Sequence, residues 1–145
     1  MGIAESSAEA DGAPETVAAT ILSPDGLKQW FKGVTRVEAD AGWPGKGTSM
    51  RWWVGRKGRW KFEAIVTEDQ RPLYVVTEVK TPSANSRITH RFEPLPGGRT
   101  RYTKQVEPRY RSRVMGLFGL PFEFLLRRWV RAEVRRAAAL FTPPR

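Results

Sequence analysis

His90 is the only histidine in the chain, and it is the first candidate for acid–base chemistry because its charge changes near neutral pH. Alternation places it on the same strand face as Ile88 and Phe92, which predicts that it points inward. No serine partner can be identified for it, and the chain has no cysteine. A hydrogen-bonded histidine in the core or in a cavity wall is therefore favoured over a catalytic one or one that contacts a ligand. A single histidine without clustered carboxylates also supplies too few ligands for a metal, so neither a metal nor a cofactor is predicted.

Lys104 is the second residue with possible chemistry, because it shares a strand face with Tyr102 and Val106. If that face is inward, Lys104 is a buried base that could bind the anionic head of a ligand. The favoured interpretation places it near the rim of the sheet, with its amine in water.

Helices are predicted at both ends of the chain from the spacing of apolar residues. Two short helices, residues 15–22 and 27–31, are separated by a Ser-Pro-Asp-Gly break, and Asp11 is expected to cap the first. A long amphipathic helix runs from residue 121 to about residue 141.

Strands are predicted between these helices, because from Val34 onward the period of the apolar residues changes to two. Regular turns divide this segment and indicate an antiparallel meander, so the fold class is α+β. A weaker first strand, or a partly disordered segment, covers residues 1–10, with its pattern between Ile3 and Ala10. The other predicted strands cover residues 34–38, 50–54, 60–66, 73–79, 88–92 and 100–106.

Aromatic side chains are unusually frequent on the predicted inward faces. One long helix cannot fill a curved sheet alone, so the remaining space is either packed by these side chains or left as a cavity that they line. Core filling is favoured for any single residue, and some cavity for the group. The predicted ligand contacts are Trp30, Trp52, Trp60, Phe62, His90, Phe92, Tyr102, Phe118, Phe122 and Trp129.

The last helix has an apolar side and a basic side. Its predicted apolar side holds Phe122, Leu125, Leu126, Trp129 and Ala137. Phe118 and Leu120, in the loop just before this helix, are a candidate mobile apolar gate, because Gly116 and Gly119 would permit motion. The basic residues most exposed to a partner are Arg127, Arg128, Arg131 and Arg135, with Arg136 and the upstream Arg109, Arg111 and Arg113 beside them. A solvated face is the favoured interpretation, ahead of contact with an anionic membrane. Nucleic acid is disfavoured, because no recognition motif is present.

Length and composition set the remaining bounds. A chain of 145 residues fits one domain over residues 1–145, ending in a tail at residues 142–145. The net charge of +10 is uneven, with −5 in residues 1–26 and +9 in residues 99–145. Neither a secretory signal nor an uncharged stretch of membrane-spanning length is recognised, so a cytoplasmic protein is expected.

Several short motifs in order resemble the START-like or SRPBCC superfamily, and within it the polyketide cyclase/dehydrase branch. They are the proline before the first helix (Pro14), the break at residues 23–25, the Trp30 to Val34 spacing, a loop glycine at Gly45 or Gly47, the acidic residues and proline at 68–72, and the corner FEPLPGGRT at residues 92–100. The resemblance covers roughly residues 11–141. It implies a helix-grip fold, in which a curved antiparallel sheet of six to seven strands grips the last helix around an elongated cavity. Family activities range from lipid transfer to polyketide cyclisation, so the fold alone does not select a function.

Three functions are compatible with these residues. The favoured one is a carrier or sensor that binds an apolar small molecule such as a lipid, a quinone or a polyketide-like aromatic. The second is a cyclase or dehydratase that uses cavity residues such as His90. The third is a basic adaptor that contacts an anionic membrane or partner through the last helix.

Overall fold

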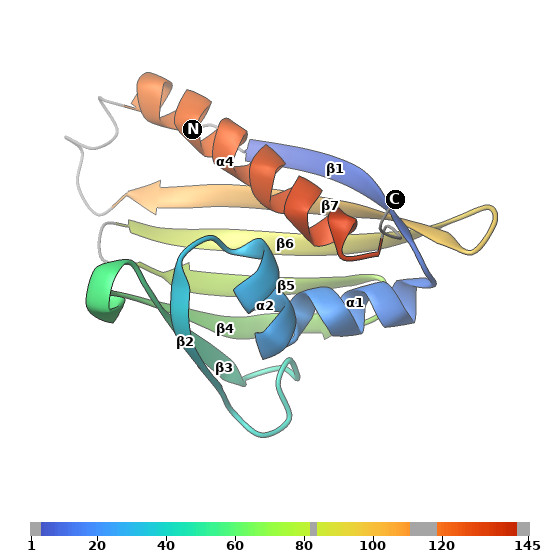
Figure 1. Cartoon of the computed structure of the whole chain (residues 1–145), viewed down its shortest axis with the longest axis horizontal. Helices are drawn as coiled ribbons and strands as arrows, with labels where there is room; N and C mark the ends of the chain where they lie inside the picture. The colour runs from blue at the N-terminus through green and yellow to red at the C-terminus, as the bar shows by residue number, and fades with distance from the viewer. Residues whose placement is uncertain (1–3, 82–83, 111–118, 142–145) are drawn as a thin grey trace.

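The computed structural model describes residues 4–81, 84–110 and 119–141 and shows a seven-stranded sheet with helices across one face (Figure 1). The strand order is β1-β7-β6-β5-β4-β3-β2, and all neighbours are antiparallel. The strands are β1 (Ala4–Asp11), β2 (Val34–Ala39), β3 (Ser49–Val54), β4 (Trp60–Gln70), β5 (Tyr74–Lys80), β6 (Ala84–Leu95) and β7 (Arg99–Tyr110). The helices are α1 (Pro14–Leu22), α2 (Pro24–Trp30), the short η1 (Arg56–Gly58) and α4 (Gly119–Ala139). The predicted α+β helix-grip arrangement is confirmed.

The first strand is better formed than its alternation suggests, because β1 pairs with β7 from Ala4 opposite Val106 to Asp11 opposite Arg99. Arg99 also forms ion pairs with Glu9 at 2.8 Å and with Asp11 at 3.1 Å. The prediction that Asp11 caps the first helix is therefore wrong, because Asp11 ends β1 and its carboxylate faces Arg99. The N-cap of α1 is Ala13, whose side chain has no oxygen that could accept a hydrogen bond from the helix.

The junction between α1 and α2 is fixed by Ser23. Its hydroxyl donates to the carbonyl of Thr20 at 2.8 Å and accepts the backbone N–H of Gly26 at 2.9 Å. The same side chain therefore satisfies a carbonyl at the end of α1 and an N–H at the start of α2. The two helices meet at one residue, and their relative orientation follows from this short connection.

Two tryptophans hold the C-terminal end of α1 against the rest of the fold. The indole N–H of Trp30 donates to the carbonyl of Ile21 at 2.9 Å, and that of Trp43 donates to the carbonyl of Leu22 at 2.7 Å. The last carbonyls of a helix have no partner within it, so these bonds satisfy groups that would otherwise be left unpaired. They also place both indole rings beside the inward face of the sheet.

The last helix packs on β1, β7 and α2. The buried residues among those described in this helix are Val130, Val134, Ala137 and Ala138. Leu125 and Trp129, which were predicted for the apolar side, are 43% and 54% exposed, and Trp129 also lines the cavity described below. The buried stripe of the helix therefore does not include these two residues of the predicted apolar side. Among the described residues, no helix has both the length and the apolar character that crossing a membrane requires.

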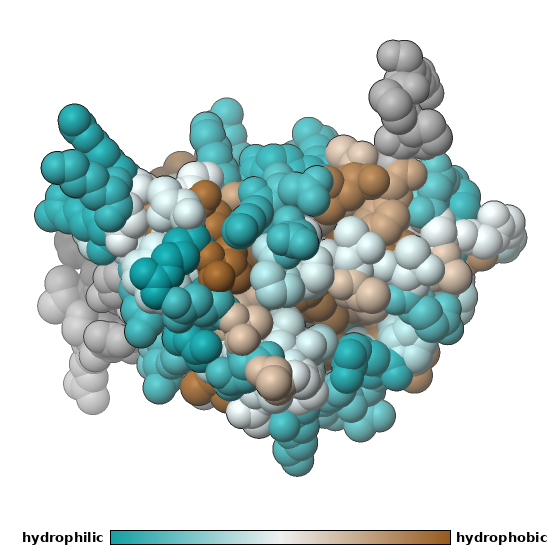
Figure 2. All heavy atoms as spheres, turned by 60° about the horizontal axis from the view of Figure 1, so that its bottom comes forward, coloured by the Kyte–Doolittle hydropathy of each residue, from teal (hydrophilic) through white to brown (hydrophobic). Residues whose placement is uncertain are grey.

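Apolar side chains also reach the surface at separate points. Trp60, Leu73 and Phe124 are 46%, 61% and 68% exposed. Figure 2 shows one face of the molecule, on which apolar residues form several patches between hydrophilic side chains and not one continuous area.

The close approach at Gly26 predicts the effect of a substitution. A Cβ atom at this position would lie 1.8 Å from the backbone oxygen of Thr20, which cannot move without disturbing α1. We expect Gly26→Ala to lower the free energy of unfolding by about 1 to 3 kcal/mol, the usual range for overpacking. Urea denaturation followed by circular dichroism measures this. Gln29→Ala, on the exposed side of the same helix, is the control and is expected to have little effect.

Candidate functional site

A cavity of about 790 Å³ lies between the inward face of the sheet and the three helices α1, α2 and α4. This volume falls within the range of about 300 to 1,000 Å³ that is usual for small-molecule sites. Most of the wall is apolar. The aliphatic and thioether residues that line it are Ile21, Leu22, Leu27, Met50, Ala64, Val79, Ala84, Ile88, Val106, Leu126, Val130 and Ala132.

Most of the predicted ligand contacts meet at this cavity. The predicted residues that line it are Trp30, Trp52, Trp60, Phe62, His90 and Trp129. They come from α2, β3, β4, β6 and α4, so the fold brings them together from distant parts of the sequence. That these six residues bind a ligand remains a prediction.

Phe92 and Tyr102, which were also predicted as ligand contacts, lie outside the cavity wall. Each is 1% exposed, and their rings stack with centroids 5.3 Å apart. They lie near the turn between β6 and β7, and this end of the two strands is covered by α1. Alternation alone cannot show this, because it identifies the inward face but not the length of strand that a helix covers. Two further predicted ligand contacts cannot be placed in the cavity. Phe118 lies outside the described residues, and so does the side chain of Phe122. The side chain of Leu120, which forms the predicted gate together with Phe118, also lies outside the described part of the chain.

Three aromatic rings pack together in one wall of the cavity. Phe31 makes edge-to-face contacts with Trp52 at 5.7 Å and with Phe62 at 5.4 Å between centroids. Trp52 and Phe62 lie opposite each other on β3 and β4, with centroids 5.6 Å apart. Such pairs add about 0.5 to 1.5 kcal/mol beyond their buried area, so they stabilise this wall. The indole N–H of Trp52 is buried without a hydrogen-bond partner in the described part of the chain.

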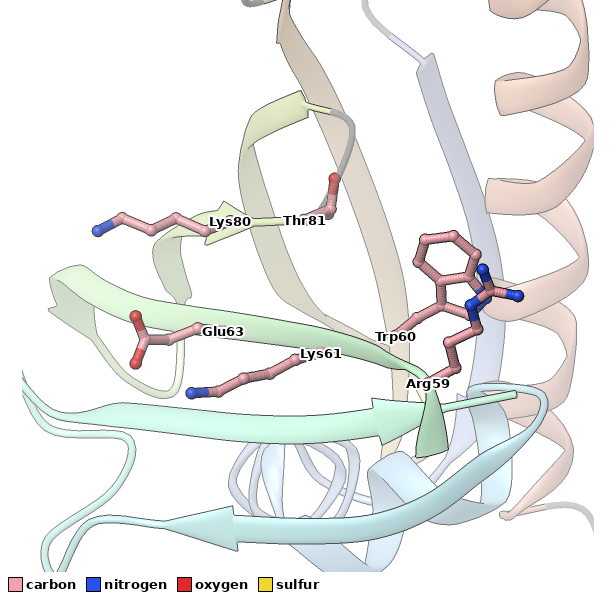
Figure 3. A pocket seen from close by; sticks show the side chains of 6 residues that line it. All are labelled: Arg59, Trp60, Lys61, Glu63, Lys80 and Thr81. Atoms are coloured by element: carbon pink, nitrogen blue, oxygen red, sulfur yellow. The ribbon is translucent and has the colours of Figure 1, made fainter. Parts of the chain in front are cut away.

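The cavity reaches the surface beside Trp60 and Trp129, which line it although each is about half exposed. In Figure 3, Trp60 and Arg59 extend from the start of β4 toward α4. Lys61, Glu63 and Lys80 extend away from that helix in the same view. Trp60 and Trp129 therefore lie at the mouth of the cavity, with Arg59 over the ring of Trp60, while Lys61, Glu63 and Lys80 point away from α4.

His90 points inward, as predicted, and is 6% exposed. Its Nδ1 lies 2.7 Å from the hydroxyl of Tyr102. Burial, followed by the positive charge of Lys104, lowers the pKa of His90 from 6.5 to about 3. Burial also raises the pKa of Tyr102 well above 10, with a smaller contribution from Glu133. At neutral pH the pair is therefore an uncharged imidazole bonded to an uncharged phenol.

Lys104 is 3% exposed, so the prediction that its amine reaches water at the rim of the sheet is wrong. It lies directly opposite His90 in the middle of the β6–β7 pair, which turns its side chain toward α4. The ammonium group donates to a carboxylate oxygen of Glu133 at 3.3 Å and lies 4.6 Å from the ring centre of Trp30. The buried cation therefore has an anionic partner and an aromatic face.

The four arginines predicted to face a partner, Arg127, Arg128, Arg131 and Arg135, are all exposed. Arg136 differs from them, because its Nε donates to the backbone oxygen of Trp30 at 2.8 Å and its side chain lines the cavity. Of these five arginines of α4, four are therefore exposed to solvent and Arg136 contributes to the cavity wall.

Besides Lys104, the cavity wall contains several residues that were not predicted as ligand contacts, among them Phe31, Trp43, Glu133 and Arg136. Trp43 lies in a loop, where no periodicity predicts direction. Arg136 was grouped with the solvated arginines. Glu133 was detectable, because it lies three positions after Val130 and four before Ala137 and so interrupts the apolar side of the helix. In the described residues, no group of histidine, aspartate and glutamate could hold a metal ion.

Comparison with known proteins places the chain in a family. The family model described as polyketide cyclase/dehydrase and lipid transport matches residues 1–141. A search of curated proteins gave no match.

Solved structures share the fold at low identity. A protein from Thermus thermophilus is 19% identical, with a TM-score of 0.71 and 95% of each chain covered. A solution structure from Arthrobacter aurescens is 16% identical, with a TM-score of 0.72, covering 97% of this chain and 86% of the other. A START superfamily protein from Mycobacterium smegmatis is 16% identical, with a TM-score of 0.64, covering 95% of this chain and 98% of the other.

The low pKa of His90 predicts a dependence of stability on pH. The unfolded chain takes up a proton on His90 near pH 6.5, whereas the folded chain does so only near pH 3. The stability contributed by the neutral imidazole is therefore complete above pH 6.5 and is lost as the pH falls toward 3, by about 1.4 kcal/mol per pH unit. We expect urea midpoints between pH 7 and pH 5 to fall more steeply in the native sequence than in His90→Gln. Parallel slopes in the two proteins would contradict a buried neutral histidine.

Proposed function

The chain belongs to the polyketide cyclase/dehydrase and lipid transport family, and from that premise we propose that it binds an apolar small molecule in its internal cavity as a carrier or sensor. The observation that carries the proposal is the cavity of about 790 Å³ with its aromatic and aliphatic wall. Apolar contact with such a wall is worth about 25 cal/mol per Å² of buried surface, which is enough to hold a lipid, a quinone or an aromatic polyketide.

The protonation states in the cavity support binding over acid–base catalysis. With a pKa of about 3, His90 carries no proton to donate as an imidazolium at neutral pH, and it is a weak base. Tyr102 remains protonated for the same reason of burial. Lys104 is held by Glu133. A cyclase or dehydratase would need one of these groups to change its protonation during turnover.

Native mass spectrometry of the protein purified from cells, followed by organic extraction, tests the proposal directly. A discrete apolar adduct is the expected result. A bare protein mass, together with no fluorescence enhancement of the apolar probe N-phenyl-1-naphthylamine, would contradict the proposal.

A substitution that reduces the cavity provides a matched test. Ala64 lies on β4 and lines the cavity, whereas Thr67 lies on the same strand and is exposed. We expect Ala64→Ile to weaken binding of N-phenyl-1-naphthylamine by about tenfold or more, because the added side chain occupies ligand space. Thr67→Ile is expected to leave the dissociation constant unchanged. The folding of both variants is checked by thermal melting. A folded Ala64→Ile protein with unaltered affinity would place the probe elsewhere.

A second candidate function, contact with an anionic membrane, is favoured by the surface of α4. Phe124 is 68% exposed and lies within one turn of Arg127 and Arg128 on the same helix. An exposed aromatic residue next to arginines suits the boundary between lipid headgroups and acyl chains. Such a surface could bring the mouth of the cavity to a source of apolar ligand.

Vesicle sedimentation tests this second function. We expect binding to phosphatidylcholine vesicles only when phosphatidylglycerol is included, and we expect binding to weaken as salt is raised. Arg128→Ser should reduce binding about fivefold, since each cation near an anionic surface contributes about 1 kcal/mol. The control is Arg56→Ser, which removes an exposed arginine in η1, away from α4, and is expected to bind as the native protein does. Equal losses in the two variants would indicate a general effect of net charge.

A further inference from the structure

Most of the cavity wall is apolar, but it also contains polar residues and charged ones, and of the charged ones Lys32 is exposed to solvent. Lys104 on β7 and Glu133 and Arg136 on α4 all line the cavity. They meet around Trp30, whose ring lies 4.6 Å from the ammonium of Lys104 and whose carbonyl oxygen accepts from Arg136 at 2.8 Å. The three side chains carry two positive charges and one negative charge at neutral pH, so the cluster has a surplus of one positive charge.

The contacts within the cluster do not use all of its hydrogen-bond donors. An ammonium group has three N–H donors and a guanidinium group has five. Lys104 has one hydrogen-bond acceptor, Glu133, and Arg136 has one, the oxygen of Trp30, among the residues that the structure describes. Lys104 is only 3% exposed, so its remaining donors have little access to bulk solvent.

We propose that the ligand is an amphiphile with an anionic head group, such as a carboxylate, which binds at Lys104 and Arg136 while its apolar body lies against the aromatic wall. This inference rests on the proposed function and names the ligand class for the same cavity. A carboxylate would neutralise the surplus positive charge of the cluster and accept the remaining donors. A cationic head would instead meet two positive groups for one negative group.

Competition with N-phenyl-1-naphthylamine measures the preference for head groups. Dodecanoate, dodecanol and dodecylamine share one alkyl chain and differ in the charge of the head. We expect dodecanoate to displace the probe at a concentration about tenfold lower than dodecanol, since one added hydrogen bond to a charged group is worth about 1.5 to 3 kcal/mol. Dodecylamine should be the weakest competitor.

Two substitutions change the preference in opposite directions. Glu133→Gln removes the internal counter-ion of Lys104, so the preference for dodecanoate over dodecanol should increase. Lys104→Met should abolish that preference while dodecanol still binds. If Lys104→Met is too unstable to fold because Glu133 is left unpaired, the double variant Lys104→Met/Glu133→Gln removes both charges and should bind dodecanol without a preference for dodecanoate.

The outcomes separate this inference from the function on which it rests. Equal displacement by the three competitors would overturn the anionic head group and leave an apolar ligand site in place. Failure of the native protein to bind the probe or any competitor would overturn the proposed function itself. A Glu133→Gln protein that is less stable but shows an unchanged preference would show that the ion pair only fastens α4 to the sheet.

Discussion

The width of the sheet is the constraint on which the cavity depends. Seven strands at a spacing of about 4.8 Å span roughly 29 Å, whereas a helix with its side chains is about 10 to 12 Å across. The last helix lies over β1 and β7, at one side of the sheet, and α1 and α2 cover part of the remainder. The space between these helices is bounded by the central strands below and by Trp30 and Trp43 at its side. The cavity is therefore a geometric consequence of covering a wide sheet with three helices of unequal length.

The charged cluster is costly in the absence of a ligand, and its arrangement limits that cost. Removing an ion pair from water costs several kcal/mol per ion unless geometry and further contacts compensate. Lys104 has both a carboxylate and an aromatic face, and Arg136 has a carbonyl oxygen. An apolar pair at these positions would often be at least as stable, so stability alone does not explain why charge is placed in this wall. The positions of the charges at the cavity, and not in the closed core near Phe92, are consistent with a role toward a ligand.

Much of the fold was predictable from the sequence, because the apolar period changes from helical to two at Val34 and back to helical before the last helix. The inward direction of His90 followed from the same alternation. The site was less predictable, because its limits depend on which helix covers which length of strand. Lys104 shows the difference most clearly: alternation placed it inward with Tyr102, but its preference for water as a residue type gave the wrong exposure. The sequence pattern also could not predict which residues of α4 are buried against the sheet. An apolar stripe broad enough to include Trp129 does not specify which of its two edges meets the sheet.

Apolar and charged parts of the cavity wall differ in how strongly they select a ligand. A hydrophobic pocket distinguishes ligands that differ by one methylene group by only about 1 to 3 kcal/mol, and aromatic rings tolerate many apolar shapes. A buried polar group that is left unpaired by the wrong ligand imposes a larger penalty, so head groups are selected more sharply than chains. In the proposed binding mode, with the head group at Lys104 and Arg136 and the apolar body against Phe31, Trp52 and Phe62, both kinds of selection would act on one ligand. A protein built in this way is suited to a class of ligands that share one end and vary in the rest, and not to a single compound.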